Sequence, residues 1–133
     1  MGLDMYLDRR IKGGDNSYSY ESLCYWGKRW PIFYWFKRHL GGDIECSKRN
    51  PVSKDILIQL RDDCYNVLKE ATDGQNVIDI EKAAKYIPIS DTDSANKYDE
   101  YYVDMVAYTL EYALYAIRTT NFEKEEILFT ANW

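Results

Sequence analysis

The sequence predicts an α+β fold in which a small antiparallel sheet, formed by both chain ends, packs with about three to four helices. Apolar and polar residues alternate over residues 3–8, as in a half-buried strand, and the apolar run over residues 127–129 has the composition of another strand. Between them, several stretches repeat apolar residues at helical spacing. The 133 residues, 46% of them hydrophobic and 29% charged, suit a single compact domain over residues 1–133.

The expected elements follow one another with short connections. They are a strand over residues 3–8, a strand over 18–26, a helix over 31–40, an extended piece around 44–46, helices over 53–71, 80–86 and 98–118, and a strand over 127–129. The second strand is predicted from its aromatic residues, which favour β-structure. Glycines between the two strands end the first one. Neither the first nor the last strand is long enough to be stable alone, so we expect them to be neighbours in one sheet.

Start and stop signals predict the helices. Pro31 suits the first turn of a helix, and Gly41 follows its last turn. Ser53 is a favourable N-cap residue for the second helix, whose apolar residues fall on one face. Pro88 closes the short third helix, and residues 90–97 have the small polar composition of a loop.

The last long helix carries two stripes on nearly opposite sides. The first, predicted to face the core, consists of Val103, Val106, Leu110, Ala113 and Ile117. The second consists of Tyr101, Met105, Tyr108, Tyr112 and Tyr115. Two interpretations of the second stripe stay open. Either the helix is packed on both sides, or the stripe docks a partner or a second copy, because Tyr and Met are enriched in interfaces.

Aromatic and basic residues alternate over residues 25–38. Such a pattern suits cation–π contacts and single-stranded nucleic acid. One short segment in a chain of net charge −5 is a weak electrostatic footprint for nucleic acid, however. We therefore expect an aromatic core with a solvated basic rim, and no direct nucleic-acid binding.

The sequence shows no catalytic or cofactor motif. His39 is the only histidine. It stands at a predicted helix end, where a favourable interaction of its imidazole with the helix dipole is a simpler explanation than catalysis. Cys24, Cys46 and Cys64 lack the close spacing of a zinc site and are expected to be buried, reduced thiols. We expect no catalytic residue, no metal and no cofactor.

Acidic residues gather around the start of the last long helix. Asp91 and Asp93 resemble the opening of a calcium loop, but Asn96 and Tyr102 stand where that loop needs glycine and glutamate. A solvated loop, with carboxylates that favour the start of a helix, is the simpler interpretation. The residues concerned are Asp91, Asp93, Asp99, Glu100 and Asp104.

The charge of the chain is unevenly distributed. The first 54 residues carry ten Lys or Arg against six Asp or Glu, whereas the remainder carries seven against sixteen. The net charge disfavours general affinity for nucleic acid or anionic membranes. No apolar run approaches the roughly 20 residues needed to span a bilayer. With its odd cysteine count and no signal segment, the chain is expected to be a soluble cytoplasmic protein without membrane partners.

Several short blocks resemble a group of small tailed-phage and prophage proteins that begin Gly-Leu-Asp-Met-Tyr-Leu. The blocks are Gly2-Leu3-Asp4-Met5-Tyr6-Leu7, Tyr25-Trp26-x-Lys28 followed by Ile32-x-x-Trp35-Phe36, Tyr98-Asp99-Glu100-Tyr101-Tyr102, and Asn132-Trp133. The resemblance implies a phage source and a bacterial host cytoplasm rather than a reaction. Small acidic phage products often act on host machinery, including as anti-CRISPR and other anti-defence proteins.

The leading hypothesis is a non-enzymatic phage accessory protein that binds and inhibits a host protein or protein–nucleic-acid complex. Clustered carboxylates can occupy a positive groove, and Tyr and Met can supply desolvated anchors. The expected contact residues are Asp91, Asp93, Asp99, Glu100, Asp104, Tyr101, Met105, Tyr108, Tyr112 and Tyr115. The alternatives are a phage structural or assembly protein that forms homo-oligomers through the same tyrosines, and a small enzyme or ligand-binding domain.

Overall fold

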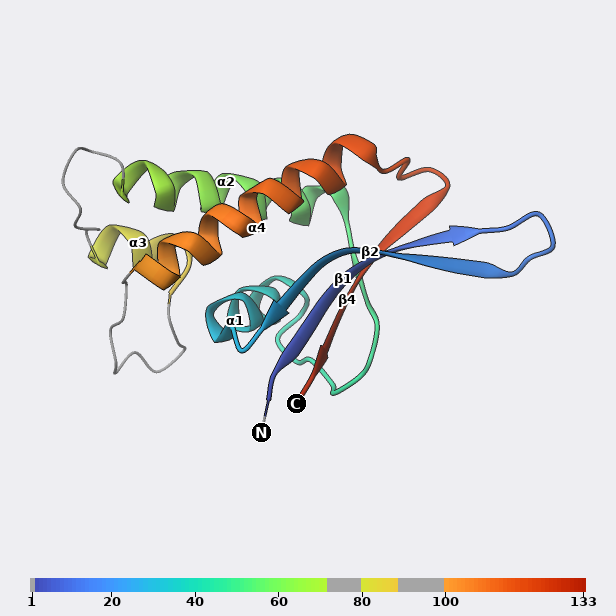
Figure 1. Cartoon of the computed structure of the whole chain (residues 1–133), viewed down its shortest axis with the longest axis horizontal. Helices are drawn as coiled ribbons and strands as arrows, with labels where there is room; N and C mark the ends of the chain where they lie inside the picture. The colour runs from blue at the N-terminus through green and yellow to red at the C-terminus, as the bar shows by residue number, and fades with distance from the viewer. Residues whose placement is uncertain (1, 72–79, 89–99) are drawn as a thin grey trace.

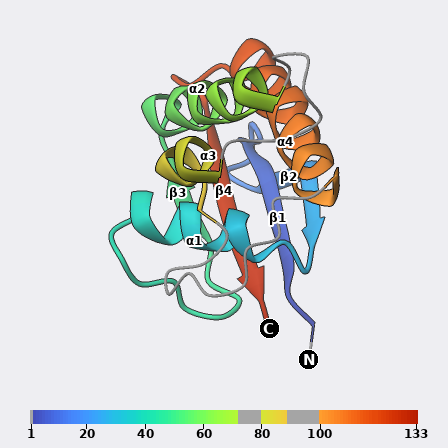
Figure 2. The same cartoon turned by 90° about the vertical axis from the view of Figure 1, so that its left-hand side faces the viewer.

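A four-stranded antiparallel sheet with helices on one face makes up the fold. The computed structural model describes residues 2–71, 80–88 and 100–133. The elements, in order, are β1 (Asp4–Lys12), β2 (Tyr18–Gly27), α1 (Trp30–His39), β3 (Asn50–Val52), α2 (Lys54–Ala71), α3 (Ile80–Tyr86), α4 (Glu100–Thr119) and β4 (Glu125–Asn132). The strand order is β2-β1-β4-β3. Figures 1 and 2 show the described helices together on one side of the sheet. The predicted α+β class is confirmed.

Both ends of the chain meet at the centre of the sheet. β1 pairs with β2 along one side and with β4 along the other, so that Asp4 lies opposite Asn132 and Ile11 opposite Glu125. Because side chains alternate along a strand, Leu3, Met5 and Leu7 all enter the core. The prediction that the first and last strands are neighbours is confirmed.

Aromatic rings from three elements fill the core between sheet and helices. Phe36 of α1 stacks on Phe129 of β4, with ring centroids 4.0 Å apart, and Trp26 of β2 lies 5.9 Å from Phe36. All three side chains are buried. The aromatic part of residues 25–38 is therefore mostly core, as expected, although Tyr25 and Trp30 stay exposed.

The third strand of the sheet was not predicted. The extended piece expected around residues 44–46 takes no part in the sheet, and β3 lies at Asn50–Val52, where Val52 pairs with Ile127. The Asn50 side-chain amide donates a hydrogen bond to the Phe129 carbonyl at 3.1 Å. A three-residue strand that contains a proline has no alternation for a sequence pattern to reveal.

A buried arginine ties the β1–β2 hairpin to the end of α4. Arg9 is 5% exposed, and its guanidinium donates two hydrogen bonds to one carboxylate oxygen of Glu21, at 2.8 and 3.0 Å. It also donates to the hydroxyls of Thr119 at 2.9 Å and Thr120 at 3.0 Å. These bonds let a charged residue occupy an inward position, so the strand continues beyond residue 8. They anchor the hairpin that projects past the helices in Figure 1.

Thr109 links α4 to β2 through its fully buried hydroxyl. The hydroxyl donates to the Met105 carbonyl at 2.8 Å and accepts from the Trp26 indole at 2.9 Å. Thr109→Val keeps the shape but leaves the indole N–H without this acceptor, so we expect the free energy of unfolding to fall by about 1–3 kcal/mol. Urea denaturation measures the loss. Thr109→Ser, which keeps the hydroxyl, should lose less, and a valine variant as stable as the wild type would contradict the expectation.

Within the described ranges, no helix combines the length and the apolar character needed to cross a bilayer.

Candidate functional site

The buried side of α4 lies between the two predicted stripes. It consists of Tyr102, Met105, Val106, Thr109, Ala113 and Ala116. Val103, Leu110 and Ile117 of the aliphatic stripe are only half-buried. The helix packs against α2 and also against β2, so burial is centred between these two neighbours rather than on one stripe.

The predicted contact residues fall into three groups. Asp91, Asp93 and Asp99 lie outside the described residues, and for Glu100 and Tyr101 the structure describes only the helical backbone.

Met105 belongs to a second group, the core. It is 5% exposed, so its assignment to an exposed contact surface is corrected. Its side chain lies between α4 and β2, where it lines a pocket together with residues of β2.

The remaining residues of the predicted surface reach solvent to different extents. Tyr108 and Tyr115 are 37% and 39% exposed, and Tyr112 is half-buried, with its ring centroid 4.8 Å from that of Tyr108. Asp104 is exposed near the start of α4. Among its described members, the Tyr/Met stripe is thus core at Met105 and surface at Tyr108 and Tyr115.

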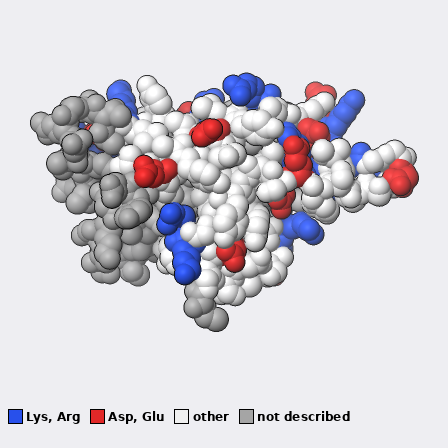
Figure 3. All heavy atoms as spheres, in the orientation of Figure 1, with Lys and Arg blue, Asp and Glu red and all other residues white. Residues whose placement is uncertain are grey.

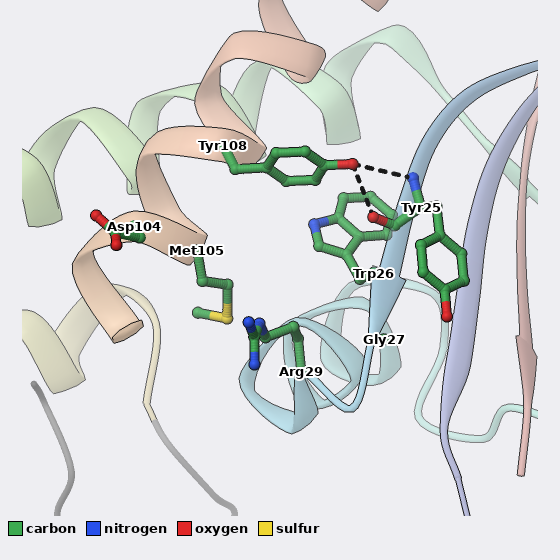
Figure 4. Close-up of a pocket in the computed structure, with 7 residues that line it drawn as sticks. All are labelled: Tyr25, Trp26, Gly27, Arg29, Asp104, Met105 and Tyr108. Atoms are coloured by element: carbon green, nitrogen blue, oxygen red, sulfur yellow. Dashed lines mark hydrogen bonds between the residues drawn. The ribbon is translucent and has the colours of Figure 1, made fainter. Parts of the chain in front are cut away.

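A pocket forms where α4 meets the connection between β2 and α1, and we call it the linker pocket (Figure 4). Its volume is about 280 Å³. The residues that line it are Tyr25, Trp26, Gly27, Arg29, Asp104, Met105 and Tyr108. This volume lies near the lower end of the range for ligand sites, roughly 300–1,000 Å³, so the pocket suits one side chain or a fragment-sized ligand.

The backbone of the β2–α1 connection has an unusual conformation next to this pocket. Lys28 has a φ of 54°, a region that non-glycine residues seldom adopt. Its amide donates to the Leu3 carbonyl at 2.7 Å, which holds the turn against β1. The Ile32 amide in turn donates to the Arg29 carbonyl at 3.0 Å, at the start of α1. Together these bonds fix the backbone position from which the Arg29 side chain extends. Strain at a single residue, on the order of 1–3 kcal/mol, is often found at binding sites.

The Tyr108 hydroxyl joins the two sides of the pocket. It donates to the Tyr25 carbonyl at 2.8 Å and accepts from the Tyr25 amide at 3.5 Å, as the dashed lines in Figure 4 show. Burial raises the pKa of Tyr108 to about 12, and burial likewise raises the pKa of Cys24 to about 12.

These raised pKa values predict a loss of stability at alkaline pH. Between pH 9 and pH 12 the two groups ionise in the unfolded chain, from ordinary pKa values of 9.0 and 10.0, but stay protonated in the folded one. The unfolded state then binds fewer protons, so the free energy of unfolding falls as pH rises through this window. Urea denaturation at several pH values measures the slope.

The Cys24→Ala, Tyr108→Phe double variant should show a shallower slope over the same window. Tyr65→Phe serves as the control, because Tyr65 is exposed on α2 and should leave the slope unchanged. An unchanged slope in the double variant would assign the alkaline loss to other groups.

The histidine and the cysteines are not brought together. The His39 ring stacks on Trp35, with centroids 3.8 Å apart, and its Nδ1 donates to the Trp35 carbonyl at 2.8 Å. All three cysteines are free. Cys24 and Cys64 are buried as expected, but Cys46 is exposed, contrary to the expectation. In the part of the chain that the structure describes, no three His, Cys, Asp or Glu side chains are grouped so that they could hold a metal ion.

Sequence reasoning missed the β2–α1 side of the pocket. It treated Arg29 as part of a solvated basic rim, and no local pattern indicates that this residue faces a helix that begins some 70 residues later. The alternation of basic and aromatic residues over residues 25–38 was the available signal. No protein-family model, curated protein or solved structure matches this chain.

Proposed function

We propose that the protein is a non-catalytic binding protein that engages a macromolecular partner through α4 and the linker pocket. The observation that carries the proposal is the presence of large hydrophobic side chains on the exposed side of α4. Tyr108, Leu114 and Tyr115 are all between 37% and 42% exposed on this one helix. Neighbouring apolar side chains left in solvent are typical of docking surfaces.

The charge around this surface supports a protein partner. Figure 3 shows a largely uncharged area at the centre of this face, with charged residues around it. Such an apolar centre with a charged rim is the usual anatomy of a protein interface. The exposed charged residues of α4 and its neighbourhood are mixed in sign, with Asp104 and Glu111 against Arg29 and Arg118.

The partner is proposed to be a host protein or protein–nucleic-acid complex that the protein inhibits. Support comes from the resemblance to phage proteins, the net charge of −5 and the aspartates at 91, 93 and 99, which precede α4 in the sequence. Anti-defence activity, of which anti-CRISPR activity is one form, is the form of inhibition proposed. The cytoplasm of the bacterial host is the proposed compartment.

Once a partner is identified, binding kinetics test whether α4 forms the interface. Asp104→Lys should change the association rate and its salt dependence, because exposed rim charges act on encounter. Tyr115→Ala should instead speed dissociation by roughly tenfold or more, as loss of an aromatic anchor does. Equal rates for wild type and Tyr115→Ala would remove this tyrosine from the interface.

A self-associating structural or assembly protein is the second candidate. The observation that favours it is the projecting hairpin, in which β2 is an edge strand and Tyr18 and Tyr20 are exposed. Analytical ultracentrifugation separates the two candidates. A monomer at all concentrations rejects self-association, and a concentration-dependent dimer lost in Tyr20→Pro would favour it.

The described lining of the linker pocket includes no serine, cysteine or histidine, and thus none of the usual nucleophile and base pairs. A small enzyme or ligand-binding domain stays the third candidate.

A further inference from the structure

We infer that the linker pocket binds the C-terminal residue of a partner chain, with the terminal carboxylate on Arg29 and an apolar side chain against Trp26 and Met105. This inference rests on the proposed function, because it names the part of the partner that enters the pocket.

The first argument concerns Arg29. Its side chain is exposed and makes no hydrogen bond or ion pair with any described residue, Asp104 included. A guanidinium presents paired N–H donors that match the two oxygens of a carboxylate. Among the described residues, Arg29 therefore has no partner to give up when it meets a carboxylate.

The second argument concerns the wall of the pocket. Trp26 and Met105 are almost fully buried, and the indole N–H already donates to Thr109. The Tyr108 hydroxyl is likewise engaged with the Tyr25 backbone. Since these polar groups are satisfied, the remaining part of this wall offers an incoming group apolar contact, to which the flexible methionine can adapt. An apolar side chain suits it better than a short acidic one.

The third argument concerns the sign of the charge. Asp104 also lines the pocket and would favour a cation. In Figure 4, however, Arg29 extends toward Met105, whereas the Asp104 carboxylate points away from it. The charge next to the apolar wall is therefore positive, which favours a ligand whose negative group adjoins an apolar body.

The volume of about 280 Å³ limits the occupant to about one residue. A chain terminus combines the required parts, because its carboxylate and its last side chain leave the same Cα atom.

Two matched probes test the inference on the full-length protein. N-acetyl-L-phenylalanine carries a free carboxylate, and N-acetyl-L-phenylalaninamide replaces it with an amide of nearly the same shape. We expect the acid to bind roughly tenfold more tightly than the amide, because a charge-assisted hydrogen bond is stronger than a neutral one. Isothermal titration calorimetry gives the affinities, and the NMR shift of the Trp26 indole N–H reports the site.

Variants assign the preference to its residue. Arg29→Gln should remove the difference between acid and amide, whereas Arg49→Gln, at an exposed arginine just before β3, should retain it. Asp104→Asn should not weaken binding of the acid.

Four results would overturn the inference. Two of them are equal affinities for the acid and the amide, and no measurable binding of either probe. The third is tighter binding of N-acetyl-L-argininamide than of the acid, in a manner that depends on Asp104. The fourth is tighter binding of free L-phenylalanine than of its acetylated form. The last would indicate a free amino acid rather than a chain terminus. If a probe test fails while a partner still depends on Tyr115, the proposed function stands and only the pocket assignment falls.

Discussion

A chain that ends at Lys124 is expected not to fold. It loses β4, which pairs with both β1 and β3, and with it four buried residues, Ile127, Leu128, Phe129 and Ala131. Loss of one fully buried phenylalanine alone costs about 3–5 kcal/mol. A whole domain is stable by only about 5–15 kcal/mol, so losing the strand should exceed the total. Circular dichroism during heating should show no cooperative transition.

The control for this truncation is a chain that lacks only Trp133. That residue is exposed, and its ring touches the core only at the edge of Phe33, with ring centroids 5.6 Å apart. This shorter truncation should keep a cooperative transition. A cooperative transition near the wild-type temperature in the chain that ends at Lys124 would show that β4 is not needed for the sheet.

Arg9→Ala is expected to lower the free energy of unfolding by about 2–3 kcal/mol. The substitution removes four hydrogen bonds, two to Glu21 within the hairpin and two to Thr119 and Thr120 at the end of α4, and leaves both threonine hydroxyls without their donor. This loss of stability is at the low end of the range expected when one partner of a buried ion pair is removed, because the Glu21 side chain is 46% exposed and its carboxylate can be hydrated. Urea denaturation measures the change.

Arg10 supplies a matched control, since it is the next residue of β1 and faces the opposite side of the sheet. Its ion pair with Glu126 is exposed, and exposed pairs contribute little to stability. Arg10→Ala should therefore destabilise much less than Arg9→Ala. Equal losses in the two variants would contradict the anchoring role of Arg9.

Local patterns predicted the elements whose causes are local. Ser53 caps α2 as expected, because its hydroxyl accepts from the Ile56 amide at 3.2 Å, and the alternation over residues 3–8 identified β1. β3 was missed, because its three residues are placed by pairing with β4 and carry no signal of their own.

The candidate site was only half predictable for a related reason. The stripe on α4 identified Tyr108 and Tyr115 as surface candidates. Met105, however, is buried, because α4 packs against β2 in addition to α2. Helical periodicity gives the direction of a side chain and not the number of elements that pack on it. Arg29 enters the site through the β2–α1 turn, which is a tertiary arrangement that its own neighbourhood in the sequence does not encode.

Affinity capture from a bacterial host lysate, with three matched baits, tests the binding proposal most directly. The baits are the wild type, Tyr115→Ala on α4 and Tyr20→Ala on the hairpin. Both tyrosines are exposed, at 39% and 45%, so neither substitution should disturb the fold, which circular dichroism checks. We predict a partner that copurifies with the wild type and with Tyr20→Ala and is lost with Tyr115→Ala. A partner that Tyr115→Ala retains in full, or the absence of any specific partner, would contradict binding through α4.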